Sequence, residues 1–113
     1  KTVCCIEKGV LPYISLNEIN YTAFGEVTEE YHDELYGFIC LNEKLQEYER
    51  DKEKIPYKKL NRNGSIHEEE RTLTHYIRDV LHHPENDNNP KYTYDDLKKS
   101  VEEMRLYIQN SME

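Results

Sequence analysis

The 113-residue sequence predicts an all-α fold, an antiparallel helical bundle of three main helices with at least one short helix. Apolar residues recur at spacings of three and four in several stretches, which places them on one face of a helix. Ser or Thr residues followed by acidic residues precede these stretches, as helix caps do. A chain of this length has room for one hydrophobic core, so residues 1–113 are expected to form a single domain.

The first half of the chain predicts a short helix followed by a long one. Ser15 and Glu18 form a capping box that starts the short helix, and Gly25 ends it. Thr28 caps the long helix, which is expected to run to about Arg50. The apolar stripe of the long helix consists of Tyr31, Leu35, Phe38, Leu41, Leu45 and Tyr48.

The next stretch predicts a loop and the third main helix. Pro56 and the dipeptide Asn63-Gly64 indicate a loop over residues 52–64. Ser65 with Glu68 is a second capping box, so a helix is expected to start here and to stop before Pro84. Its apolar stripe consists of Ile66, Leu73, Ile77, Val80 and Leu81.

Local sequence signals predict a helix near the C-terminus and an extended segment at the N-terminus. Thr93, followed by Asp95 and Asp96, starts the last helix. The apolar stripe of this helix consists of Leu97, Val101, Met104 and Ile108. Residues 1–12 contain helix breakers and are expected to be extended, with at most one strand.

Composition restricts the function classes. The net charge of −8 speaks against a general nucleic-acid coat, but residues 50–62 hold six basic residues against two acidic ones. The three cysteines have neither C-x-x-C nor zinc spacing, and there is no apolar run long enough for a signal peptide or a membrane span. We therefore expect a cytoplasmic protein with reduced thiols and no membrane partner. Because the first residue is Lys, the chain is compatible with being a fragment of a longer protein.

The end of the third main helix carries the strongest chemical signal. On an ideal helix Arg78 lies about 140° from His83, whereas it shares a face with His82. Pro84 disfavours helical geometry at His83, so the His83 ring can turn back towards Arg78. A guanidinium beside an imidazole suits phosphate chemistry, because one binds phosphate oxygens and the other moves protons near neutral pH. The simpler interpretation is a solvated helix end, where basic side chains interact favourably with the helix dipole.

The stretch from Arg78 to His83, with Asp79 in second place, resembles the R-x4-H signature of HEPN domains. The run from His82 to Asn86 is similar to that of many bacterial members. The resemblance implies a bundle of four or five helices and a metal-independent endoribonuclease that leaves 2′,3′-cyclic phosphate ends. It implies that His83 moves the proton, Arg78 stabilises charge on the phosphate, and Asp79 orients one of them or binds across an interface. His82 is the alternative proton carrier.

The same resemblance implies RNA as the substrate and a homodimer in which two signatures share one composite cleft. It also implies a toxin or effector of a bacterial defence or toxin–antitoxin system, with an antitoxin or a larger defence complex as partner. Two other classes stay open: a non-catalytic module that dimerises or binds a partner, and a regulatory domain of a larger ATPase or nuclease.

The basic loop is a candidate RNA-binding element, because lysines can follow a phosphate backbone and a tyrosine can stack on a base. Its alternative role is an exposed connector that keeps the chain soluble. On the long helix, one of Glu29, Glu30, His32 and Glu34 is a candidate to face the signature. The RNA-binding candidates are Lys54, Tyr57, Lys58, Lys59 and Arg62.

No cofactor or metal is expected. A site built from His67, His75, His82 and His83 lacks an evident completing carboxylate or cysteine, and the H-E-x-x-H pattern is absent. The sequence also has neither a Gly-rich phosphate loop nor a serine in a nucleophile elbow.

Overall fold

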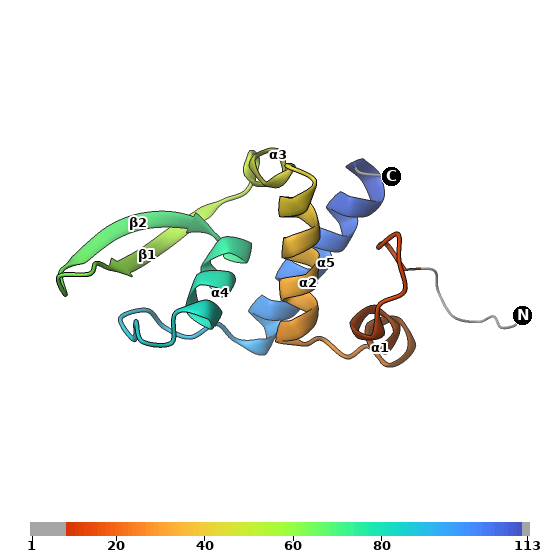
Figure 1. Ribbon diagram of the computed structural model, residues 1–113, viewed down its shortest axis with the longest axis horizontal. Helices are drawn as coiled ribbons and strands as arrows, with labels where there is room; N and C mark the ends of the chain where they lie inside the picture. The colour runs from red at the N-terminus through yellow and green to blue at the C-terminus, as the bar shows by residue number, and fades with distance from the viewer. Residues whose placement is uncertain (1–8, 112–113) are drawn as a thin grey trace, which may run out of the picture.

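The computed structural model describes residues 9–111, and the predicted extended segment 1–12 lies mostly outside this range. Within residues 9–111 the fold consists of five helices and one two-stranded antiparallel hairpin (Figure 1). In chain order the elements are α1 (Leu16–Phe24), α2 (Glu29–Leu41), α3 (Leu45–Glu49), β1 (Lys54–Leu60), β2 (Ile66–Thr72), α4 (Leu73–His82) and α5 (Tyr94–Ser111).

The predicted all-α class is wrong, because the structure is a mixed fold with a β-hairpin where a loop and a helix start were expected. β1 pairs with β2 in the register Lys54↔Thr72 to Leu60↔Ile66. Gly64 lies in the turn with φ 87°, and glycine adopts such a positive φ at little cost. Ser65 and Glu68 therefore do not cap a helix. Thr72 does so instead, accepting the amide of His75 at 3.2 Å at the start of α4.

The predicted long helix from Thr28 to Arg50 is interrupted, so that it forms α2 and α3. At the break, the Asn42 side chain donates to the Phe38 carbonyl at 2.8 Å, which competes with continuation of the helix. Glu43 then adopts φ 59°, in the left-handed region. As a result Leu41, predicted to be in the apolar stripe, is 83% exposed at the end of α2.

Local capping signals predicted α1 and α5 correctly. Ser15 Oγ accepts the Glu18 amide at the start of α1, and Gly25 ends it with φ 68°. Thr93 and Asp96 cap α5 reciprocally, with bonds of 3.0 and 3.1 Å. The four predicted apolar residues of α5 are all buried: Leu97, Val101, Met104 and Ile108.

The core lies between α2, α4 and α5, while α1 packs against α2 (Figure 1). The hairpin extends away from these helices on the side opposite α1, so the molecule measures 57 × 25 × 21 Å. Since β2 runs directly into α4, the hairpin is held beside this helix. The largest fully buried apolar side chains are Tyr31, Tyr48, Leu35, Ile39, Ile77, Met104 and Ile108.

A buried chain of hydrogen bonds ties α4 to the other helices. Tyr48 Oη lies 2.7 Å from Thr74 Oγ1, which lies 2.7 Å from Ser100 Oγ. Ser100 Oγ is in turn 2.8 Å from His32 Nε2. Each residue comes from a different helix (α3, α4, α5 and α2), so the chain fixes how α4 sits in the bundle. Buried polar groups with partners of this kind favour one packing arrangement.

No helix within residues 9–111 has the combination of length and apolar character that crossing a membrane requires.

Candidate functional site

His83 leaves the helix at the end of α4, as Pro84 predicts. Its backbone has φ −128° and ψ 65°, outside the helical region, while its amide still donates to the Asp79 carbonyl at 3.0 Å. The helix therefore ends at His82, and His83 side-chain direction is set by the turn into Pro84.

Arg78 and His82 lie on the part of α4 that faces α2. The Arg78 guanidinium lies over the Tyr36 ring, 4.4 Å from its centroid. His82 Nε2 lies 2.9 Å from Asp33 Oδ2. The long helix thus does supply a polar residue that faces the signature. It is Asp33, which was missed in favour of its neighbours in the sequence.

Asp79 and His83 lie on the part of the helix that faces the hairpin. Both line a cavity of about 250 Å³ between the end of α4 and the hairpin. His83 Nδ1 also lies 3.2 Å from Glu85 Oε2. The other residues that line this cavity are Tyr57, Lys59, Leu60, Arg71, His75 and Asn86.

His75 connects the two parts. Its ring lies 6.1 Å from the Tyr36 ring, which Arg78 covers, and it also lines the cavity. On an ideal helix, five side chains of this stretch would fall within about 140° of one another. They are those of His75, Arg78, Asp79, His82 and, if the helix continued one residue further, His83. His75, Arg78, Asp79 and His82 therefore form one polar stripe along α4, and the turn after the helix places His83 beside it. The structure does not turn the His83 ring back towards Arg78, because Arg78 lies over Tyr36 of α2 whereas His83 lines the cavity beside Glu85.

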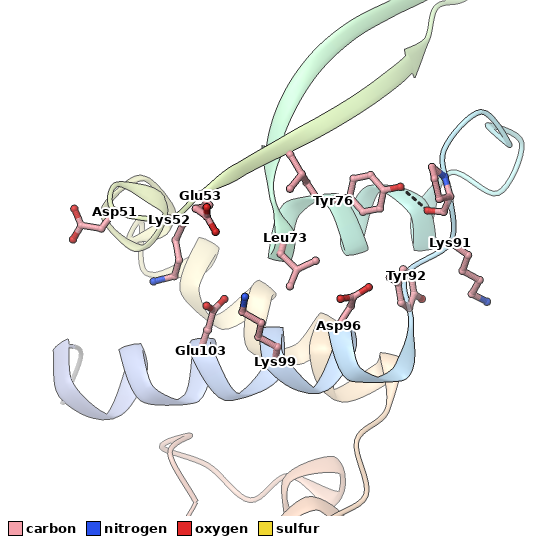
Figure 2. Close-up of a pocket in the computed structure, with 12 residues that line it drawn as sticks. Asp51, Lys52, Glu53, Leu73, Tyr76, Lys91, Tyr92, Asp96, Lys99 and Glu103 are labelled. Atoms are coloured by element: carbon pink, nitrogen blue, oxygen red, sulfur yellow. Dashed lines mark hydrogen bonds between the residues drawn. The ribbon is translucent and has the colours of Figure 1, made fainter.

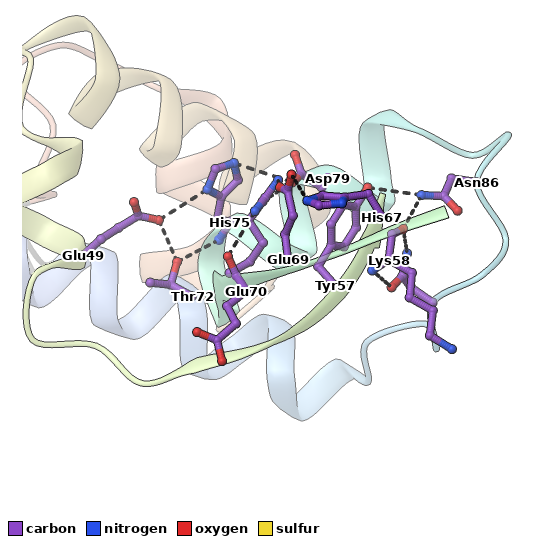
Figure 3. A network of polar contacts seen from close by, with 12 residues as sticks. Glu49, Tyr57, Lys58, His67, Glu69, Glu70, Thr72, His75, Asp79 and Asn86 are labelled. Atoms are coloured by element: carbon purple, nitrogen blue, oxygen red, sulfur yellow. Dashed lines mark hydrogen bonds and ion pairs between the residues drawn. The ribbon is translucent and has the colours of Figure 1, made fainter. Parts of the chain in front are cut away.

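Carboxylates hold the His75 ring from both sides (Figure 3). His75 Nδ1 lies 3.5 Å from Glu49 Oε2, and Nε2 lies 3.5 Å from Asp79 Oδ2. Thr72 Oγ1 donates to the same Glu49 oxygen at 2.8 Å. The hydrogen bond from His75, together with that from Thr72, lowers the pKa of Glu49 although burial acts to raise it. Glu49 is therefore a carboxylate at neutral pH, and it orients the imidazole.

Arg71 brings a cation from the hairpin into the same network. Its Nε lies 3.1 Å from Asp79 Oδ2, and its Nη2 pairs with Glu69. The guanidinium also lies over the Tyr57 ring, 5.1 Å from the centroid. Neither Arg71 nor His75 was predicted as a site residue. Spacings of four, from Arg71 to His75 and from His75 to Asp79, could have indicated both residues. In the structure Arg71 reaches Asp79 from β2.

The predicted RNA-binding residues are spread along β1 and the turn. Tyr57 is 4% exposed and packs edge-on against Tyr76 at 6.0 Å. Lys59 lines the cavity, whereas the backbone of Lys58 is bonded by Asn86 and Asn89. Lys54 and Arg62 are exposed. Of this set, the structure brings only Tyr57 and Lys59 to the residues at the end of α4.

A second cavity, of about 620 Å³, lies between α4, α5 and the segment before β1 (Figure 2). Leu73 and Tyr76 of α4 face it, and the Tyr76 hydroxyl donates to the Pro90 carbonyl at its margin. Lysines and carboxylates such as Lys99 and Glu103 alternate around it. No histidine lines it, so the smaller cavity is the better candidate for proton transfer.

Within residues 9–111, no group of three or more His, Cys, Asp or Glu side chains is arranged to hold a metal ion. Comparisons of the chain with protein-family models, with curated proteins and with solved structures find no match.

Proposed function

We propose that this chain is a metal-independent endoribonuclease whose site is the polar stripe of α4 and the cavity beside it. The observation that carries the proposal is the cavity lining, where two histidines, His75 and His83, occur with two cations, Lys59 and Arg71. Imidazoles move protons and cations bind phosphate oxygens, so the set contains the groups that phosphodiester cleavage needs. The resemblance of Arg78 to His83 to the R-x4-H signature supports the same function.

The reaction is an internal transesterification of RNA. The 2′-oxygen attacks the adjacent phosphorus and loses its proton to His83, whose side chain is 54% exposed and can reach a substrate. The bond from phosphorus to the 5′-oxygen breaks, and that oxygen takes a proton from His75. The products are a 2′,3′-cyclic phosphate and a 5′-hydroxyl, and no metal is required. For this transfer His75 starts protonated; Glu49 holds its Nδ1, and its Nε2 has to leave Asp79 and turn its proton to the 5′-oxygen.

Phosphate binding in this site involves exchange of ionic partners. Arg71 is already paired with Glu69 and Asp79, so a phosphate has to compete with two carboxylates for it. Lys59 lines the same cavity and is exposed. Arg78, at the margin of the stripe that faces α2, adds a cation for the next phosphate of a bound RNA strand. In a homodimer the stripes of two copies would face one cleft and double the number of these cations.

This proposal places the protein in the cytoplasm, as a toxin or effector that an antitoxin or a larger defence complex holds in check. The competing function is a non-catalytic module that dimerises or binds a partner. Large apolar side chains on and just before α1 favour it, because Ile14, Leu16 and Phe24 are 91%, 72% and 76% exposed.

The test is an RNA cleavage assay on matched histidine variants. His83→Ala is expected to lower the cleavage rate at least about 100-fold, the usual contribution of a general base. Arg78→Ala is expected to weaken it as well. His67→Ala is the matched control, because His67 lies on the hairpin, is 63% exposed and does not line the cavity. Equal rates for the His83→Ala and His67→Ala proteins would remove the assignment, and RNA binding without cleavage would favour the non-catalytic module.

A further inference from the structure

The two edges of the hairpin differ in their free backbone groups. The Asn61 amide donates to the Ser65 carbonyl at 2.9 Å, and residues 61 and 65 continue the register of the strands. Hydrogen-bonded pairs alternate along an antiparallel ladder, so Lys59 with His67 and Tyr57 with Glu69 bond to each other. The residues between these pairs direct their amides and carbonyls away from the partner strand. On β2 these outward residues are Ile66, Glu68 and Glu70, and on β1 they include Pro56 and Lys58.

The outer edge of β1 is closed. Pro56 has no amide proton to offer. The Lys58 amide donates to Asn89 Oδ1 at 2.8 Å. The Lys58 carbonyl accepts from Asn86 Nδ2 at 2.8 Å and from Asn89 Nδ2 at 2.9 Å. The loop after α4 therefore occupies this edge, as proteins commonly do to protect an edge strand.

The outer edge of β2 is open. Within residues 9–111, no hydrogen bond from another element reaches the main chain of Ile66, Glu68 or Glu70, and only the adjacent Arg71 side chain reaches the Glu70 carbonyl. Residues 66–68 and Glu70 are exposed, and the hairpin projects from the helices (Figure 1). A two-stranded ribbon gains stability from a third strand, so this edge is suited to strand addition.

We propose that the outer edge of β2 binds an extended, basic segment of a partner protein as a third strand. Three consecutive glutamates, Glu68, Glu69 and Glu70, lie along this strand. Glu68 and Glu70 are exposed on one face. Glu68 lies opposite Lys58, whereas Glu70 lies opposite Pro56, which provides no cation. Lysines or arginines at alternate positions of an added strand would lie opposite these carboxylates, the arrangement that stabilises a cross-strand pair.

The charge and the closed β1 edge disfavour the other occupants. A second copy pairing through its own β2 would place glutamates opposite glutamates, which is destabilising. A second copy pairing through β1 would first have to displace Asn86 and Asn89. RNA would be repelled by the same carboxylates. The edge adjoins the proposed nuclease cavity through Arg71, but binding of a basic strand does not depend on RNA cleavage.

The probe is a fluorescein-labelled octapeptide of alternating lysine and threonine, titrated by anisotropy. Saturable binding is expected, and none is expected for the same peptide with glutamate in place of lysine. The double substitution Glu68→Lys with Glu70→Lys is expected to weaken binding about tenfold or more, because it converts two attractive pairs into repulsive ones. Glu102→Lys, an exposed charge reversal of the same kind on α5, should change the affinity less than about twofold.

Two measurements on the wild-type protein make the test independent of how the variants fold. In hydrogen exchange, the outward amides of Glu68 and Glu70 should gain protection on peptide binding, while those of His67 and Glu69, already bonded to β1, should not change. A peptide N-methylated at alternate amides should lose binding, since it cannot complete the ladder. Each of four results would overturn the proposal. They are absence of saturation at about 1 mM peptide, protection of amides at another surface, equal binding of the methylated peptide, and self-association of the protein through this edge.

Discussion

Acid should destabilise this protein through His32 before its carboxylates titrate. The side chain of His32 is fully buried, with Ser100 Oγ at 2.8 Å from Nε2. Nδ1 has no hydrogen-bond partner among the described residues. Burial, and then the positive charge of Arg78, lowers the pKa of His32 from 6.5 to about 4. The folded state therefore holds this imidazole neutral, whereas the unfolded chain protonates it below pH 6.5.

The sign and the size of the effect follow from linkage. Between pH 6.5 and about 4 the unfolded state binds one more proton at His32 than the folded state does. The contribution of His32 to the free energy of unfolding is therefore fully present above pH 6.5. Below that pH the free energy of unfolding falls by about 1.4 kcal/mol per pH unit. This gives a loss of about 2 kcal/mol between pH 7 and pH 5, a large part of the 5 to 15 kcal/mol typical of small domains. The loss should level off near pH 4.

The assay is urea unfolding at pH 7, 6 and 5 for the wild type and for His32→Gln, which cannot titrate. The unfolding free energy of the wild type should fall by about 2 kcal/mol more than that of His32→Gln across this range. His67→Gln, at an exposed position on the hairpin, should behave as the wild type does. Parallel pH curves for the wild type and His32→Gln would refute the reasoning, because they would show that His32 titrates alike in both states.

Three further substitutions test the packing of the helices and the turn of the hairpin. Ser100→Ala leaves the buried His32 ring without a hydrogen-bond partner, whereas Thr74 keeps Tyr48, and should lower the free energy of unfolding by about 1 to 3 kcal/mol in urea; an unchanged midpoint would contradict this. Gly64→Ala, at φ 87°, should cost about 1 kcal/mol and speed amide exchange in β1 and β2. Arg105→Ala removes the cation paired with buried Glu18 at 3.3 Å and should cost about 3 kcal/mol, measured by thermal unfolding.

The sequence predicted the elements whose starts and stops are local. Ser15 with Glu18, and Thr93 with Asp96, satisfy the helix-end amides from within their own turn, so α1 and α5 could be located without tertiary information. Pro84 likewise predicted that His83 leaves the helix. These signals act within a few residues, and the rest of the fold does not override them.

The hairpin could not be predicted from composition alone. β2 contains three glutamates in a row, which have low strand propensity, and Ser65 with Glu68 imitates a helix start. Pairing with β1 and the Asn63-Gly64 turn prevail over these local preferences. The expected helix would have put Arg71 on the same face as His75, but only the strand brings it against Asp79 and Tyr57. The sequence therefore indicated candidates on α4 and, on β1, Tyr57 and Lys59, but not Arg71 of β2.

The most direct test of the proposed chemistry is the structure of the RNA ends that the purified protein produces in the presence of EDTA. Internal transesterification by His75 and His83 predicts fragments with 2′,3′-cyclic phosphate and 5′-hydroxyl ends, and loss of these fragments when both histidines are replaced by alanine. The absence of cleavage at every protein concentration, or the same fragments from the doubly substituted protein, would contradict it.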